Sequence, residues 1–262
     1  MHFPRDPDGS DFETSPILGF GEVSNALIAR LSERFQQSAA DGTEAAIDTI
    51  TLGVPADSAP RSRRGGAHNS AARQSHALSS GQIANLIAAE AHAAQIGLPF
   101  NRMITIHWEA AGVPLDGIAK ATGGFIDLLT KAITRHGGKT AWLWVHEGGE
   151  QKGGHCHLLA HVPADLVPTI SKLQLGWLRR ITGQPYKASV IHSKPIGGRL
   201  GLEDSNAQLL AVNRQAALNY VVKGGDAEAI KAFGLVRSEA GGLVIGKRCG
   251  TSQNIGPKAR KS

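Results

Sequence analysis

The stretch Lys139 to Val162, KTAWLWVHEGGEQKGGHCHLLAHV, decides the fold that the sequence predicts. Its first part, 139–147, is rich in Trp, Leu and Val, a composition typical of strands. A polar, glycine-rich connection over 148–154 separates it from a second strand over 155–162. Two neighbouring strands joined by one loop form an antiparallel hairpin. The sequence therefore predicts a hairpin with a long loop.

Further predicted elements flank this hairpin. Before it come a strand over 103–108 and a helix over about 114–135; after it come a helix over about 164–182, a strand over 187–193 and a helix over about 205–223. The order is strand, helix, strand, strand, helix, strand, helix. It predicts an α+β fold, an antiparallel sheet of four or five strands with helices packed on one face.

Three regions are expected along the 262 residues. Residues 1–78 form a partly disordered N-terminal region, with one amphipathic helix over 17–38. Residues 79–225 form the organised domain. Residues 226–262 form a basic C-terminal extension.

Composition excludes some classes of protein. No apolar run approaches the roughly 20 residues that a bilayer requires, and the N-terminus lacks the apolar core of a secretory signal. Two cysteines far apart, Cys156 and Cys249, are typical of a reducing compartment rather than a disulfide scaffold. The expected location is the cytoplasm. The net charge of +6 is compatible with nucleic-acid binding without demanding it.

The segment His155-Cys156-His157 carries the first candidate chemistry. Residues two apart on a strand project to the same face, so the two imidazoles can share one metal ion while Cys156 points into the core. Glu147, at the end of the partner strand, is the expected third ligand. Two nitrogens and one carboxylate with open positions suit Mg²⁺ or Mn²⁺ bound together with a substrate.

Two other residues remain rivals for the third position. His146 should face the same way as Trp142 and Trp144, away from the paired histidines. Glu150 lies in the loop and reaches the site only if the loop folds back. His161 shares the face of His155 but lies more than about 12 Å along the strand, so it is expected to touch DNA or water.

Tyr220 and Lys223 form the second candidate feature, at the end of the last predicted helix. Residues three apart share a helix face, so the two side chains should lie side by side. Tyr220 lies on a small, polar stripe rather than on the apolar one. The chain has only two tyrosines, Tyr186 and Tyr220.

The ordered set resembles the HUH endonuclease superfamily. A strand around Ile104-Thr105-Ile106, then Glu147 with His-x-His, then Tyr-x-x-Lys on a later helix occur in the order of its replication initiators. The resemblance covers about 100–225, and the tail from Gly246 is also similar. Cys156 departs from the bulkier aliphatic residue usual there, although cysteine also packs as a small hydrophobe.

The resemblance implies a ferredoxin-like variant of the fold and single-stranded or hairpin origin DNA as substrate. It implies that Tyr220 attacks the scissile phosphate and forms a 5′-phosphotyrosine, starting rolling-circle replication of a mobile element. Lys223 would then favour the phenolate or stabilise charge on the phosphate. The basic tail is expected to hold the DNA backbone through Lys247, Arg248, Lys258 and Arg260.

Other functions remain open at this stage. A single-tyrosine transposase or relaxase of the same superfamily uses the same parts, although relaxases usually place the tyrosine before the histidines. A non-catalytic DNA-binding module of the same fold is a further alternative. The phosphate-binding motif of a helicase is absent from the sequence, so a host helicase and a polymerase are expected as partners. The oligomeric state stays undetermined.

Overall fold

The structure is a computed structural model, and it describes residues 72–149, 153–196, 206–235 and 237–261. The helix expected over 17–38 lies outside these residues. So does nearly all of the region expected to be partly disordered, 1–78.

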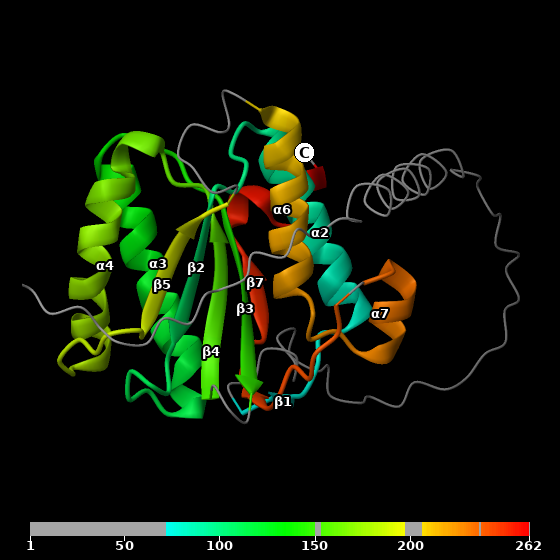
Figure 1. Ribbon diagram of the computed structural model, residues 1–262, viewed down its shortest axis with the longest axis horizontal. Helices are drawn as coiled ribbons and strands as arrows, with labels where there is room; N and C mark the ends of the chain where they lie inside the picture. Colours follow the sequence, from blue (N-terminus) through cyan, green and yellow to red (C-terminus); the bar gives the residue numbers. More distant parts are fainter. Residues whose placement is uncertain (1–71, 150–152, 197–205, 236, 262) are drawn as a thin grey trace, which may run out of the picture. The chain divides into compact units, whose positions relative to one another are not determined.

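Five strands form one antiparallel sheet at the centre of the described fold (Figure 1). Their order is β5-β2-β4-β3-β7, and each neighbouring pair is antiparallel. The strands are β2 (Arg102–His107), β3 (Trp142–Gly149), β4 (Gly153–Ala160), β5 (Ile191–Pro195) and β7 (Cys249–Thr251). The α+β class and the antiparallel sheet expected from the sequence are confirmed.

Helices α3 (Ile118–Arg135) and α4 (Val167–Thr182) cover one face of this sheet (Figure 1). The apolar stripe of α3 packs on the inward residues of β2, β3 and β4, because every second strand residue points to this face. The core side chains here include Ile104, Ile106, Trp144, Cys156, Leu158, Phe125, Leu129 and Trp177. Among the described helices, none is long and apolar enough to cross a membrane.

The second face is covered only in part. Helices were expected on one face only, whereas α2 (Ser80–Gln95) and α6 (Ala207–Val221) also pack against Leu143, Val145 and Leu159 on the other. The reason is that β3 and β4 are apolar on both faces along part of their length, and such strands are buried on both sides. Helix α7 (Ala227–Phe233) adds to this layer through Ala229.

Several element boundaries differ from those expected. The hairpin loop expected over 148–154 is shorter, because Gly148 pairs with Gly154 and Gly149 with Gly153, and these glycines belong to β3 and β4. The helix expected from about 114 begins as a short 3₁₀ turn, Leu115–Gly117, and becomes α3 at Ile118. The strand expected over 187–193 begins only at Ile191, because residues 188 and 189 form a turn in which Ser189 has φ 63°. Short 3₁₀ segments also lie at Ala164–Leu166, Gln253–Ile255 and Ala259–Lys261.

The expected boundaries at 79 and 225 are both corrected. Leu78 is fully buried, and β1 (Gln74–Ser75) pairs with β6 (Val244–Ile245). Strand β7 completes the edge of the main sheet beside β3. The segment after residue 225 is therefore part of the same fold rather than an extension from it, because β7 pairs with the edge of β3.

A close contact between two glycines joins this segment to the end of β3. Gly148 and Gly242 form a parallel bridge, and Gly148 N–H donates to the carbonyl of Gly241 at 3.0 Å. A Cβ at Gly148 would overlap the carbonyl oxygen of Leu243, and Gly242 has φ 63°. Only glycine permits this approach of the two backbones.

We expect Gly148→Ala to destabilise the fold by about 2–4 kcal/mol, because the added methyl forces the two backbones apart. Gly149→Ala is the matched control, since a Cβ there meets nothing within 4 Å. It should change the free energy of unfolding by no more than about 0.5–1 kcal/mol. Urea unfolding measures both variants. Equal losses of unfolding free energy in the two variants would show that the Gly148–Gly242 contact does not require glycine.

Candidate metal centre

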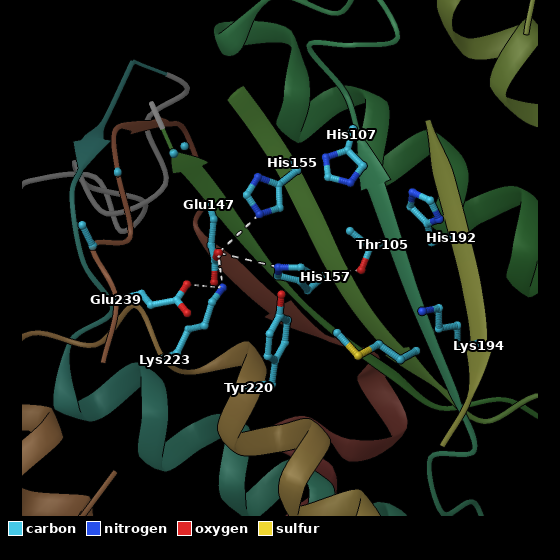
Figure 2. Close-up of a pocket in the computed structure, with 15 residues that line it drawn as sticks. Thr105, His107, Glu147, His155, His157, His192, Lys194, Tyr220, Lys223 and Glu239 are labelled. Atoms are coloured by element: carbon cyan, nitrogen blue, oxygen red, sulfur yellow. Dashed lines mark hydrogen bonds and ion pairs between the residues drawn. The ribbon is translucent and has the colours of Figure 1, made fainter. Parts of the chain in front are cut away.

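The polar ends of β2, β3 and β4 meet the C-terminal end of α6 at an open cavity of about 890 Å³ (Figure 2). The cavity lies on the second face of the sheet, where the strand residues change from apolar to polar. Along β3 this face carries Leu143, Val145 and then Glu147. Helices cover the apolar part and leave the polar part open, so the change in polarity positions the cavity.

Glu147, His155 and His157 lie together on this face. Their ligating atoms are all within 4.8 Å of one another, and all three side chains are buried. Glu147 stands directly opposite His155 in the β3–β4 register. Glu147 Oε2 lies 3.3 Å from His155 Nε2 and 3.6 Å from His157 Nε2. This cluster could hold a metal ion.

The hydrogen bonds of the triad leave ligand atoms available at its centre. His155 Nδ1 donates to the Gly153 carbonyl at 2.9 Å, so the lone pair of the neutral ring is on Nε2. His157 Nδ1 lies 3.0 Å from the Thr105 hydroxyl. Within the described part of the chain, His157 Nε2 and Glu147 Oε1 are buried without a hydrogen-bond partner. Buried polar atoms without a partner are rare in proteins. A cation bound between these residues would give both atoms a partner.

The protonation of the triad also suits a metal. Burial lowers the pKa of His157, so the ring stays neutral despite the nearby carboxylate. Burial alone would raise the pKa of Glu147. The close contacts with His155 and His157 and the pairing with the Lys223 ammonium outweigh it, and they hold that pKa well below its usual range. The site therefore offers a neutral imidazole beside an ionised carboxylate, the forms in which both bind metals.

His146, a rival for the third position, faces the opposite side of the sheet, as its alternation with Trp144 predicted. Its Nε2 accepts from the Thr122 hydroxyl at 2.8 Å, and its Nδ1 donates to the Lys247 carbonyl at 2.9 Å. Burial lowers its pKa to about 4. His146 is thus a neutral core residue with both nitrogens occupied. Glu150, the other rival, lies outside the described residues.

Tyr220 projects from the last turn of α6 toward the triad, and Figure 2 shows its hydroxyl beside His157. The two ring centroids are 5.1 Å apart. Lys223 Nζ lies 4.4 Å from the Tyr220 ring, so the expected neighbourhood of the two residues is confirmed. Arg237 stacks on the same ring at 5.0 Å. Two cations therefore flank this phenol.

Lys223 is buried and makes a contact that its sequence position did not predict. Its ammonium pairs with Glu147 Oε2 at 2.5 Å and with Glu239 Oε2 at 3.4 Å. Glu239 lines the cavity, and its backbone N–H donates to the Lys223 carbonyl. Glu239 and Arg237 could not be predicted as site residues, because both lie in a stretch of sequence without periodicity.

The basic residues expected to hold DNA lie elsewhere, and none is among the residues that line the cavity. Lys247 and Lys258 are exposed. Arg248 is only 2% exposed, and its guanidinium donates to the carbonyls of Ser75, Gly241 and Gly242. The expectation that Arg248 contacts DNA is therefore wrong, because its charge is used inside the fold.

Arg260 is partly buried and donates to the Ile255 carbonyl and to Asn85. Its side chain therefore fastens the C-terminal segment to α2. His161, expected to meet DNA or water, donates from Nδ1 to the Pro99 carbonyl at 2.8 Å. Tyr186, the second tyrosine, is exposed and lines a separate hollow beside Arg179 and Arg180.

Searches against protein-family models, curated proteins and solved structures found no match for this chain.

Proposed function

We propose that this protein is a metal-dependent endonuclease and strand transferase that nicks single-stranded DNA through Tyr220. One observation carries the proposal: a tyrosine with Lys223 and Arg237 near its ring meets His157 of a buried Glu/His/His cluster edge-on, with ring centroids 5.1 Å apart. Such a cluster next to a phenol serves phosphoryl transfer, which needs a cation on the phosphate and a nucleophile in line with it.

Mg²⁺ or Mn²⁺ is the metal that we propose. Glu147, His155 and His157 would hold it. Three protein ligands leave positions for water and a phosphate oxygen, and a carboxylate together with such oxygen ligands suits Mg²⁺ or Mn²⁺. Once bound, such an ion polarises the scissile phosphate and neutralises charge that develops on it.

The residues of the chain perform the bond changes. The Tyr220 hydroxyl loses its proton as its oxygen attacks phosphorus, and the bond from phosphorus to the 3′ oxygen breaks. The leaving oxygen takes up a proton and becomes a free 3′-OH. The 5′ phosphate stays on Tyr220 as a phosphodiester, so attack by a 3′-OH reverses the reaction without another energy source.

The neighbours of Tyr220 assist the start of this reaction. Lys223 and Arg237 lie over the phenol ring, so their charge would stabilise the negative charge that develops on the phosphate next to it. Lys223 is held in place by Glu147 and Glu239, so its charge is positioned before the substrate arrives. Preorganised charge of this kind lowers a barrier without further rearrangement.

We propose the start of rolling-circle replication in the cytoplasm as the biological setting, because a free 3′-OH primes synthesis directly. The substrate is then the origin of a mobile element, with a host helicase and a polymerase as partners. Transposases with the same order of motifs differ in target DNA rather than in chemistry, so the nicking reaction is tested first.

The test uses the purified full chain, a pool of single-stranded oligonucleotides with a 3′ label, and Mn²⁺. We expect a labelled protein band on a denaturing gel, because the 5′ phosphate of the labelled fragment remains on the protein. The band should disappear with a chelator and return with excess Mn²⁺. Binding of the pool without cleavage under all metals tried would contradict the proposal and favour a non-catalytic module.

A further inference from the structure

A second polar cluster extends the cavity wall from the metal centre to the edge of the sheet. His192 and Lys194 project from β5, two residues apart and so on one face. His107 projects from β2 between β5 and β4 (Figure 2). All three line the cavity, and the proposed chemistry uses none of them.

The imidazoles form a continuous row. The His107 ring stacks on His155 with centroids 5.4 Å apart, and it meets His192 edge-on at 5.8 Å. Thr105 lies directly between His157 and His192 in the register of β4, β2 and β5. Two strand spacings, about 10 Å, therefore separate the metal centre from β5. A phosphodiester backbone that leaves the metal centre along this row reaches Lys194 at the sheet edge.

Charge divides the cavity into two sides. Its acidic lining residues are Glu147 and Glu239, and both are paired with Lys223 on the side of β3 and α6. The side of β2 and β5 has no acidic lining residue in the described part of the chain. An anion on that side therefore meets imidazoles, a hydroxyl and one ammonium, and no carboxylate among the described lining residues. His192 and Lys194 are exposed and so accessible to it.

We propose that His192 and Lys194 bind a second phosphate of the DNA strand, the neighbour of the scissile phosphate. The proposal rests on the function proposed above and adds the path of the strand, from Tyr220 across β4 and β2 to β5. Met103, opposite Lys194 in the register, contributes an apolar wall beside that path. The contacts are to the backbone, so they set position and affinity rather than sequence preference.

The test measures binding of labelled oligo(dT) by fluorescence anisotropy over a series of salt concentrations. All proteins carry Tyr220→Phe, so that DNA is bound but not joined. We expect Lys194→Gln to weaken binding about five- to tenfold at low salt and to reduce the slope of log K against log salt by about one, since one phosphate contact is lost. His192→Ala should weaken binding about two- to fivefold.

Two further variants separate the site from general charge. Lys194→Arg keeps the charge and should retain both affinity and slope. Lys187→Gln removes an exposed lysine outside the cavity and should leave binding unchanged. Thermal melting checks that each variant is folded, which is expected because these side chains are exposed.

The outcomes distinguish this proposal from the function on which it rests. Normal binding and slope in Lys194→Gln and His192→Ala would overturn the phosphate site alone, provided that covalent nicking is intact in the parent protein, which is the chain with Tyr220 unchanged. Equal losses in Lys187→Gln would also overturn it, because the effect would be nonspecific. Competition by thymidine monophosphate as strong as by oligo(dT) would assign the cluster to a free nucleotide instead. Absence of DNA binding and of nicking by the parent would overturn both proposals.

Discussion

Tyr220→Phe is expected to abolish the covalent protein–DNA product and to lower nicking on the order of a thousandfold or more. The substitution removes only the hydroxyl oxygen that forms the bond to phosphorus. The phenyl ring keeps its place beside His157 and between Lys223 and Arg237. Affinity for single-stranded DNA should therefore remain within about twofold of the parent, because no phosphate contact is lost. Denaturing gels measure the product, and anisotropy measures the binding.

Tyr186→Phe is the matched control, since the chain has two tyrosines and Tyr186 lies outside the cavity. This substitution should leave the amount of covalent protein–DNA product unchanged. Digestion of the labelled product should place the DNA on the peptide that contains Tyr220. Survival of the adduct in Tyr220→Phe, or its loss in Tyr186→Phe, would assign the nucleophile elsewhere and remove the main support of the proposed function.

The geometry of the candidate metal centre could be predicted from the sequence because strand alternation is a strict rule. Glu147, His155 and His157 share a face once β3 and β4 pair through one loop, and the same rule sends His146 and Cys156 into the core. The neighbourhood of Tyr220 and Lys223 follows as simply from the helix repeat. Local periodicity thus determines these relations without knowledge of the tertiary fold.

The parts that could not be predicted depend on contacts between distant segments. Strand β7 is three residues long, too short for a periodic pattern, and it belongs to the sheet only because β3 offers a free edge. Glu239 reaches Lys223 because Gly148 and Gly242 allow two backbones to touch. Arg248 is an arginine in a basic segment, as DNA contacts often are, but its side chain is buried and binds backbone carbonyls of the fold. Charge in a sequence does not distinguish these two roles.

Removal of one imidazole gives the second large effect that we expect. His157→Ala should lower the affinity for Mn²⁺ by about 100-fold or more, and nicking should fall on the order of a thousandfold. His157 contributes an Nε2 that has no hydrogen-bond partner among the described residues, so the substitution deletes a candidate ligand. It also removes the contact with the Thr105 hydroxyl and the ring that packs against Tyr220 and His155. The protein should stay folded, with a loss of stability of about 1–3 kcal/mol from the space left.

Thermal melting with and without Mn²⁺ provides a readout that does not depend on activity. Mn²⁺ at 100 times its Kd should stabilise the parent by about 2.7 kcal/mol, because it binds the folded state alone. The same concentration should leave the melting temperature of His157→Ala nearly unchanged. His161→Ala is the control, since this histidine bonds the Pro99 carbonyl outside the triad. An equal Mn²⁺ shift in His157→Ala would exclude His157 as a ligand.

His157 is a better probe of the metal than Glu147, for a reason that lies in Lys223. Glu147→Gln removes a ligand but also leaves the buried Lys223 ammonium without its closest counter-charge, and breaking a buried pair costs about 3–5 kcal/mol. A failure of Glu147→Gln to bind Mn²⁺ would then reflect unfolding as much as lost coordination. His157→Ala leaves the pair of Glu147 and Lys223 intact. If it loses the Mn²⁺ shift and the nicking together while Lys223 remains paired, the metal is required for cleavage in addition to the charge that Lys223 supplies.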